Sequence, residues 1–192
     1  DLVFVFFDRF QLDLERAGLK VLYVKTLSDD FTKIGKMIRM WGRITAKPTA
    51  AEDVAADFEA SVERIKNTLK PYEMGPTIFQ DVGEFWTPGT DTLVSEVFEL
   101  LKLENIAQDV SGYAQLSPEV IVERNPQIIF TGNRETFMGN LAFKNVSAVI
   151  NDRVFELQPD LLSIAGPRFV HGIEEIARIV YPELFEQVKQ NS

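Results

Sequence analysis

Residues 76–101 read PTIFQDVGEFWTPGTDTLVSEVFELL, and they predict a strand, a turn and a helix in that order. The apolar run at residues 77–79 contains β-branched side chains, which is typical of a short buried strand. Glycine and proline break that pattern between residues 83 and 89. Leucines and valines then recur at helical spacing over residues 93–101, so this stretch predicts one strand–loop–helix unit of an α/β sheet.

Two large aromatic side chains, Phe85 and Trp86, lie on the glycine- and proline-containing loop of this unit. In an open α/β sheet, ligands usually bind at the loops that follow the carboxyl ends of the strands. Exposed aromatics on such a loop would form part of a ligand site. The alternative is that both rings fold back beneath the loop, because aromatic side chains are usually buried.

Composition sets the broad class of the protein. The chain has 192 residues, 45% hydrophobic and 26% charged, as expected for one large or two small globular domains. The formal net charge of −9 argues against nucleic acid or an anionic membrane as the main partner. There is no cysteine, which excludes disulfides and thiolate chemistry, and no apolar run reaches the ~18 residues of a transmembrane helix.

The first half of the chain predicts a βαβ unit followed by two helices. Strands are expected at residues 2–7 and 20–25, with Gly18 ending the helix between them, so the strands should be parallel. Ser28 is expected to cap the next helix, which Gly42 ends or interrupts. A helix of about 20 residues should then begin at Pro48, with Thr49 and Glu52 forming a capping box.

The second half predicts a further α/β set. Ser117 followed by Pro118 is a helix start, and strands are expected at residues 127–131 and 153–157. Residues 105–109 are predicted as a short strand and residues 135–144 as irregular or weakly helical. Helices are expected to begin at Gly166-Pro167 and at Pro182, the latter running through residue 188. The order of elements indicates two α/β units joined by helix.

Few residues point to catalysis. His171 is the only histidine and lies within a predicted helix, and neither a nucleophile elbow nor a glycine-rich phosphate loop is present. Asp81, Glu84 and Asp91 are close in sequence, so they could hold a hard cation, act as an acid–base pair, dock a basic partner or remain solvated. Arg168 opposes the dipole at a helix start, which either a carboxylate or an anionic ligand would offset.

Several segments match the motifs of one protein family, in that family's order: 1–3, 17–21, 86–97, 103–107, 116–129, 151–155 and 166–168. One example is Asn151-Asp-Arg-Val-Phe, which is similar to the family's Asn-Gly-Arg-Val-Tyr. Leu101-Lys-Leu departs from the family's Gly-Gly before Asn-Ile. On these residues the chain resembles the periplasmic substrate-binding proteins of ABC importers for vitamin B12 and iron siderophores, a class with two α/β lobes and a rigid helical spine.

The resemblance implies an α/β fold with three parts: residues 1–27 as the remnant of an N-terminal lobe, 28–74 as the helical spine, and 75–192 as a Rossmann-like, parallel-sheet C-terminal lobe. About 100 residues of the N-terminal lobe would then be missing before Asp1. Because half of the cleft would be absent, we expect weak or no ligand binding by this chain alone. Without its former neighbours, the N-terminal strand would have an unsatisfied edge, which predicts self-association.

The resemblance also implies function. The protein would be a binding protein rather than an enzyme, with no catalytic residue, resident metal or cofactor, and would carry cobalamin, a ferric siderophore or haem. By position, Phe85, Trp86 and Tyr113 would contact this chelate, and Arg168 is a fourth candidate. The ABC permease would dock on Asp91 or, as second choice, Glu96, and the full-length protein would be periplasmic or lipid-anchored at the cell surface. The alternatives are a cation-dependent carboxylate enzyme and a protein-interaction module without a small ligand.

Overall fold

The computed structural model describes residues 2–5, 8–24, 30–157, 162 and 165–185. The strands are β1 (Leu2–Val5), β2 (Lys20–Tyr23), β3 (Thr77–Gln80), β4 (Trp86–Pro88), β5 (Glu104–Asn105), β6 (Tyr113–Gln115), β7 (Ile128–Thr131) and β8 (Val154–Glu156). The α-helices are α1 (Gln11–Arg16), α2 (Ile34–Ile44), α3 (Pro48–Leu69), α4 (Leu93–Leu100), α5 (Pro118–Arg124), α6 (Glu135–Met138), α7 (Ser147–Ile150), α8 (Phe169–Val180) and α9 (Pro182–Phe185). The 3₁₀ turns are η1 (Asp8–Phe10), η2 (Phe31–Lys33) and η3 (Leu141–Phe143).

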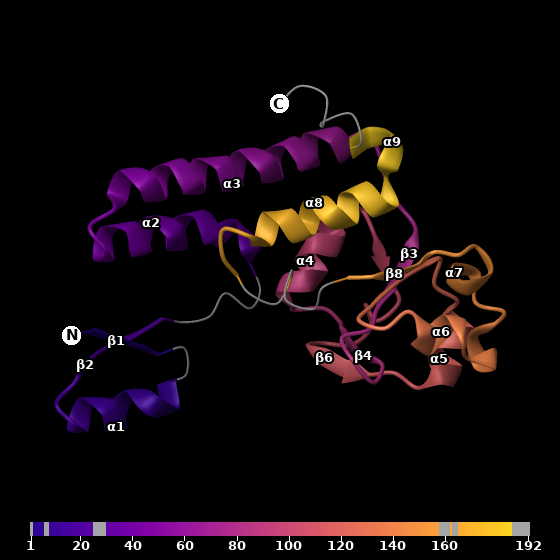
Figure 1. Cartoon of the computed structure of the whole chain (residues 1–192), viewed down its shortest axis with the longest axis horizontal. Helices are drawn as coiled ribbons and strands as arrows, with labels where there is room; N and C mark the ends of the chain where they lie inside the picture. The colour runs from indigo at the N-terminus through magenta and orange to yellow at the C-terminus, as the bar shows by residue number, and fades with distance from the viewer. Residues whose placement is uncertain (1, 6–7, 25–29, 158–161, 163–164, 186–192) are drawn as a thin grey trace.

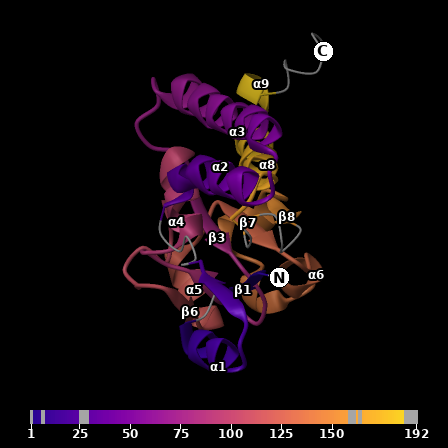
Figure 2. The same ribbon diagram turned by 90° about the vertical axis from the view of Figure 1, so that its left-hand side faces the viewer.

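The C-terminal part of the chain is built on a four-stranded sheet with the order β5-β3-β7-β8. All three pairings in this sheet are parallel. Helices α4 and α8 lie on one side of the sheet and helices α5, α6 and α7 on the other (Figures 1 and 2). This arrangement confirms the predicted α/β class with a parallel-sheet C-terminal lobe.

Alternation along the central strands explains the two faces of the sheet. Ile78 on β3 and Phe130 on β7 belong to the larger hydrophobic core, which they share with the long helices. Phe79 and Ile129, their neighbours in sequence, belong to the second core beneath α5, α6 and α7. Successive side chains of a strand point to opposite faces, so uninterrupted apolar runs are what a sheet covered on both sides requires.

The described helices of the predicted spine are η2, α2 and α3, and helix α8 runs beside α2 and α3 along one edge of the molecule (Figure 1). Helix α3 has 22 residues and is therefore about 33 Å long. Gly42 was expected to end or interrupt α2, and this was wrong, because the helix continues to Ile44. The glycine instead allows close helix packing: a Cβ at Gly42 would lie 2.2 Å from the Cβ of Ala51 on α3.

The predicted capping box of α3 is also wrong. Lys47 occupies the N-cap without a side-chain hydrogen bond, although Pro48 is at the first helical turn as expected. Glu52 is instead paired with Arg39 on α2, whose Nε and Nη2 donate to the two carboxylate oxygens at 2.8 Å each. Arg39 also donates to Glu59, so one guanidinium links α2 to two turns of α3.

Residues 2–24 form a separate small unit. Strands β1 and β2 pair in parallel around α1, as predicted, and Gly18 has the left-handed conformation (φ 81°) expected after that helix. The unit lies below α2 in the view of Figure 1. Phe4 on β1 contacts Trp41 on α2 edge-on, with ring centroids 4.4 Å apart. It carries several exposed apolar side chains, namely Leu2, Phe10, Leu12, Leu19 and Tyr23.

Some predicted bounds change. Of the strand expected at residues 105–109, only Asn105 is in a strand, as the second residue of β5 (Glu104–Asn105), and residues 135–144 contain α6 and η3. The side chain of Asp30 caps η2 by accepting from the N–H of Thr32. Ser28, residues 6–7 and the predicted helix beyond Phe185 lie outside the described residues. Among the helices that are described, none is long and apolar enough to cross a membrane.

Candidate functional site

The loop predicted to carry exposed aromatics contains a short strand. Trp86–Pro88 forms β4, which pairs antiparallel with β6, so that Trp86 lies opposite Gln115 and Pro88 lies opposite Tyr113. Cross-strand partners share a face, and residues two apart do too, so Trp86 and Tyr113 are diagonal neighbours on one face of this two-stranded sheet, the β4–β6 strand pair. The two rings are 43% and 51% exposed, which makes this face an apolar platform open to solvent.

Tyr113 adds a hydrogen-bonding group to this platform. Partial burial raises the pKa of the Tyr113 phenol above its usual value of 10.0. The hydroxyl is therefore uncharged at neutral pH and can donate as well as accept a hydrogen bond. Such a face suits a flat apolar ligand with polar edges better than it suits a strongly charged one.

Phe85 behaves differently from its neighbour Trp86. Its φ of 63° is left-handed, and its half-buried ring packs edge-on against Phe137 and Phe143, with centroids 5.8 Å and 5.7 Å apart. Phe85 is thus packed against the second hydrophobic core. The two alternatives left open by the sequence are both realised, one for each ring: Phe85 folds beneath the loop and Trp86 faces solvent. The ligand contact expected of Phe85 stays a prediction.

A buried carboxylate holds this loop in shape. Gly83, Glu84 and Phe85 are consecutive residues with positive φ, a conformation that is costly for the two that are not glycine. Asp81, only 7% exposed, accepts hydrogen bonds from the N–H groups of Gly83 and Phe85 at 2.9 Å and from the Oγ1 of Thr131 at 3.0 Å. Asp81 is therefore committed to positioning the loop.

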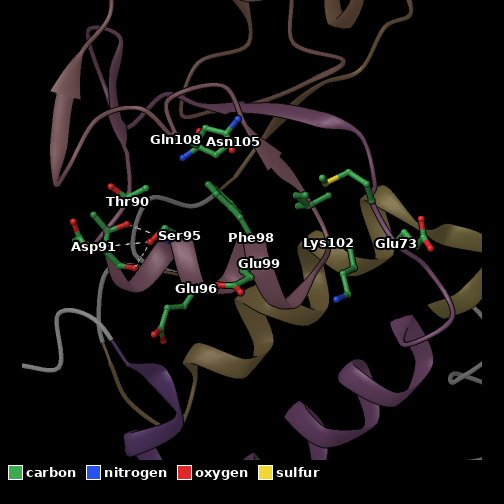
Figure 3. A pocket seen from close by; sticks show the side chains of 13 residues that line it. Glu73, Thr90, Asp91, Ser95, Glu96, Phe98, Glu99, Lys102, Asn105 and Gln108 are labelled. Atoms are coloured by element: carbon green, nitrogen blue, oxygen red, sulfur yellow. Dashed lines mark hydrogen bonds between the residues drawn. The ribbon is translucent and has the colours of Figure 1, made fainter.

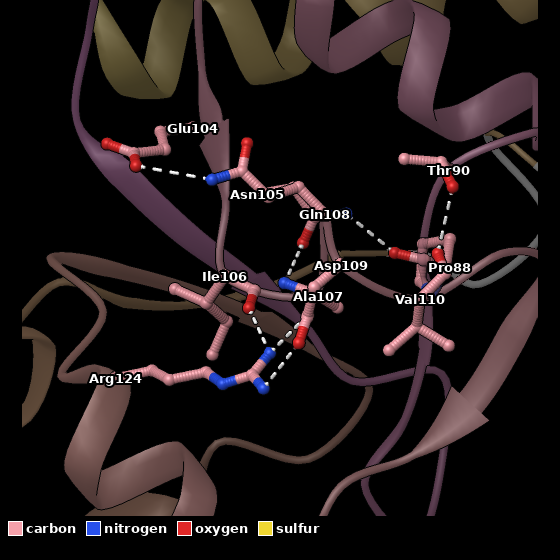
Figure 4. Close-up of polar contacts among 10 residues, drawn as sticks. All are labelled: Pro88, Thr90, Glu104, Asn105, Ile106, Ala107, Gln108, Asp109, Val110 and Arg124. Carbon is pink, nitrogen blue, oxygen red and sulfur yellow. Dashed lines mark hydrogen bonds and ion pairs between the residues drawn. The ribbon is translucent and has the colours of Figure 1, made fainter.

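A second polar network fixes the β4–β6 strand pair to the four-stranded sheet (Figure 4). Asn105 at the end of β5 is 6% exposed, donates to the carbonyl of Pro88 at 2.7 Å and accepts from the N–H of Ala107 at 3.0 Å. Arg124 at the end of α5 donates to the carbonyl of Ile106 and, through both Nη atoms, to Asp109. These bonds give the aromatic platform a rigid support.

The two predicted docking acids line a groove along α4 with a volume of about 630 Å³ (Figure 3). Asp91 is exposed, has a φ of 59° and accepts a hydrogen bond from the Oγ of Ser111 at 2.8 Å. Glu96 is half-buried, and its Oε2 accepts from the backbone N–H of Phe31 at 3.0 Å. Glu96 therefore ties the C-terminal lobe to the start of the spine.

Two further charged residues, Arg168 and Glu119, lie at the first turns of helices. Arg168, the fourth predicted ligand contact, is exposed at the start of α8, whose first residue, Phe169, stacks on Phe31 of the spine. Sequence reasoning did not single out Glu119, which is exposed at the first turn of α5, just after β6. Hydrogen bonds from its own backbone N–H and from Ser117 lower the pKa of Glu119, so it is ionised at neutral pH. Acidic residues favour first helical turns, which is the sequence feature that could have identified it.

The carboxylate-enzyme alternative finds no site in the part of the chain that the structure describes. The carboxylate of Asp81 accepts a hydrogen bond from the loop backbone at Gly83. The carboxylate of Asp91 accepts one from the Oγ of Ser111. Within those described residues, no group of three histidine, aspartate or glutamate side chains could hold a metal ion. An α/β lobe beside a helical spine, with two exposed aromatic rings at the end of its sheet, is the architecture of a ligand-binding protein.

Comparison with known proteins identifies the family. The model of a family described as periplasmic binding protein matches residues 1–161, so the chain belongs to the periplasmic binding proteins. Members of this family are binding proteins and not enzymes, which confirms the prediction made from the resemblance.

Individual relatives agree with this assignment. The chain is 28% identical over 182 residues to an uncharacterised ABC transporter substrate-binding lipoprotein of Bacillus subtilis, covering 91% of this chain and 58% of that protein. It is 33% identical over 177 residues to a cobalamin-binding protein of Halobacterium salinarum, covering 85% and 48%. The chain thus spans about half the length of these relatives.

The fold has close counterparts among solved structures. The crystal structure of the periplasmic vitamin B12-binding protein BtuF of Vibrio cholerae superposes with a TM-score of 0.79 at 23% identity, over 100% of this chain and 76% of that one. The periplasmic haem-binding protein RhuT of Roseiflexus superposes with a TM-score of 0.80 at 17% identity, over 94% and 75%. Proteins named for different ligands therefore share this fold, and the ligand has to be argued from the site.

Proposed function

We propose that this chain is part of the extracytoplasmic substrate-binding component of an ABC importer, and that its solute is a metal chelate with a broad apolar face. The observation that carries the proposal is the exposed platform of Trp86 and Tyr113 on one face of the β4–β6 strand pair. Burying such a ligand face against two aromatic rings is favourable without any charge pairing. The names of the relatives, which include cobalamin-binding proteins, support the same class.

Among the three predicted chelates, this platform favours a flat macrocycle such as cobalamin or haem over a ferric siderophore. A siderophore complex is compact and usually anionic, and would need cationic contacts. Arg168 is the predicted cationic contact, but it lies at the start of α8 and not on the β4–β6 strand pair. As in all two-lobed binding proteins, the ligand would sit between this platform and a second lobe, so binding by this chain alone should be weak.

The test is calorimetric titration with cyanocobalamin and haem of two variants that each lose one tryptophan. Trp86→Ala should weaken binding about tenfold to a hundredfold, because burial of an aromatic face contributes ~1.5–3 kcal/mol. Trp41→Phe is the matched control, since Trp41 packs against Phe4 of the N-terminal unit. Equal affinities of wild type and Trp86→Ala would remove the platform from the ligand site.

We further propose that the lobe docks on a basic surface of the permease through an exposed carboxylate. Asp91 remains the first candidate, and Glu119, which is ionised and close to the platform in sequence, replaces Glu96, whose carboxylate already binds Phe31. Charge pairs at the rim of an interface mainly affect association rate and salt dependence.

The docking test uses the reconstituted importer and its stimulated ATPase activity. Asp91→Asn or Glu119→Gln should lower the apparent affinity for the importer, more strongly at low salt than at high salt. Glu123→Gln is the control, because Glu123 is another exposed acid of helix α5. If neither variant differs from the control, docking does not depend on these carboxylates. The periplasmic or lipid-anchored location remains part of this proposal.

A further inference from the structure

A basic segment interrupts this acidic chain. Residues 31–51 contain no aspartate or glutamate, although the chain as a whole has 29 acidic and 20 basic residues. The segment forms η2, α2 and the turn into α3, and this turn lies at the left-hand end of the molecule in Figure 1, the end that faces the viewer in Figure 2. The segment carries five cationic side chains, which are Lys33, Lys36, Arg39, Arg43 and Lys47.

Two of these cations are neutralised by carboxylates and three are not. Lys33 forms an ion pair with Asp30, and Arg39 forms ion pairs with two glutamates of α3. The other three are exposed and form no ion pair within the described part of the chain: Lys36, Arg43 and Lys47. This end of the molecule therefore keeps an uncompensated positive charge.

Helix α2 presents two of the unpaired cations on its outer face. Lys36 and Arg43 are seven residues apart, which is two turns of helix, so they lie on one side of α2. The half-buried Met40 and the 38% exposed Ile44 follow the same helical spacing and lie on that side too. The opposite side is buried, with Ile38 in the larger hydrophobic core. The outer face of α2 thus combines free cations with accessible apolar groups.

This combination restricts the partner that the face fits. An anionic lipid surface offers phosphate groups to the cations and hydrocarbon just beneath them, where the side chains of Met40 and Ile44 can be buried. An acidic protein surface would also pair with the cations, but it would place these two apolar side chains against charged groups. A bilayer of anionic phospholipid therefore matches both kinds of side chain on the face.

The net charge of −9 opposes such a contact less than it suggests. Exposed charges are screened beyond a Debye length of about 8 Å at physiological salt, whereas α3 alone is about 33 Å long. The two acids of α3 that reach α2, Glu52 and Glu59, are already paired with Arg39. The outer face of α2 would therefore meet a membrane mainly with its own local charge, and the acidic remainder would limit the contact to this face.

We propose that the outer face of α2 is a docking surface for an anionic phospholipid bilayer, with Lys36 and Arg43 as the cations that bind lipid phosphate and Lys47 supporting them from the adjoining turn. The inference goes beyond the proposed function, because it concerns a different surface and needs no chelate. In the setting of that function, the contact would hold the protein near a membrane-embedded importer. Three cations give weak and reversible binding.

The first test is co-sedimentation of the chain with vesicles. At low salt the chain should bind vesicles made of equal parts phosphatidylglycerol and phosphatidylcholine, and it should not bind vesicles of phosphatidylcholine alone. Added salt should weaken the binding, because it screens the charges. Equal binding to both kinds of vesicle would assign the contact to exposed apolar surface, and no binding to the anionic vesicles would remove the contact, so either result would overturn the inference.

Substitutions on α2 identify the responsible residues. Lys36→Gln/Arg43→Gln should weaken binding to the anionic vesicles about 25-fold, because each cation near such a bilayer contributes about fivefold. Lys36→Glu/Arg43→Glu should weaken it further. The matched control for this charge reversal is Lys66→Glu/Lys144→Glu, since both lysines are exposed, lie outside α2 and give the same change in net charge. Equal losses in the two charge-reversed variants would mean that net charge alone decides, and the inference would fall.

The same variants test the rival partner, an acidic face of a second copy of the chain. Light scattering at low salt measures self-association of the wild type, of Lys36→Glu/Arg43→Glu and of the control. Self-association that only the α2 variant loses, without binding to vesicles, would assign the face to another copy and overturn the inference. Selective binding to the anionic vesicles that only the α2 variants lose would support it. Chelate binding plays no part in either measurement, so a failure of the proposed function leaves this test intact.

Discussion

Replacing Asp81 by alanine should destabilise the lobe and collapse the loop that presents Trp86. The carboxylate accepts three hydrogen bonds: two from the backbone N–H groups of Gly83 and Phe85 and one from Thr131. These bonds hold three consecutive residues in the left-handed region of the backbone. Without the acceptor, the loop loses these three bonds and keeps those that Gln115 and Leu116 donate to the carbonyls of Glu84 and Phe85.

The magnitude follows from the bonds that are lost. A hydrogen bond to a charged group contributes about 1.5–3 kcal/mol, but a surface loop can relax and expose its freed donors to water, so Asp81→Ala should cost ~3 kcal/mol in total. Asp81→Asn keeps one acceptor oxygen for both backbone donors, and only the bond from Thr131 is reversed or lost. Its cost should be about 1 kcal/mol.

Thermal and urea unfolding measure this difference. For a chain of this size, 1 kcal/mol corresponds to about 2–4 °C, so Asp81→Ala should melt about 6–12 °C below wild type and Asp81→Asn about 2–4 °C below. Near-ultraviolet circular dichroism of Trp86 should change with alanine and little with asparagine. Glu84→Gln, on the same loop but exposed, is the control. Equal melting of the alanine variant and wild type, or equal losses for alanine and asparagine, would refute the reasoning.

Three further predictions concern the spine and the N-terminal unit. Gly42→Ala should cost ~1–3 kcal/mol in urea unfolding, because its methyl group would overlap that of Ala51. Hydrogen bonds from Arg39 lower the pKa of Glu59 below its ordinary 4.5. Their stabilisation is complete above that pH and is lost as the pH falls through the lowered pKa, so the stability gap between wild type and Arg39→Met should close in acid. Light scattering after size exclusion should detect self-association that Leu12→Glu reduces, and a monomeric wild type at high concentration would contradict this.

Much of the fold was predictable because local patterns and burial agree. The apolar runs of β3 and β7 gave the central strands, and Ser117 with Pro118 gave the start of α5. The failures have a common physical cause, which is the packing of α2 against α3. Glu52 forms an ion pair with Arg39 and not a capping box. Position 42 holds a glycine because α3 packs so closely there that a Cβ would overlap the side chain of Ala51.

The candidate site was predictable only in outline. The sequence placed aromatics on the loop after β3 but could not separate Phe85 from Trp86, because the left-handed backbone that turns one ring inward is set by Asp81 and Thr131 from two strands. The pairing of β4 with β6 was missed, because β4 has three residues and β6 lies well downstream in the sequence.

The most direct test of the central claim, capture of a chelate on the aromatic platform, is a fluorescence titration. Trp41→Phe leaves Trp86 as the only tryptophan, and this variant is titrated with cyanocobalamin, haem and a ferric siderophore. The measurement is made on this chain and on a version extended by an N-terminal lobe from a relative. The proposal predicts saturable quenching of Trp86 by a flat macrocycle, tighter in the extended version. No saturable quenching by any of the three chelates in either version would contradict it.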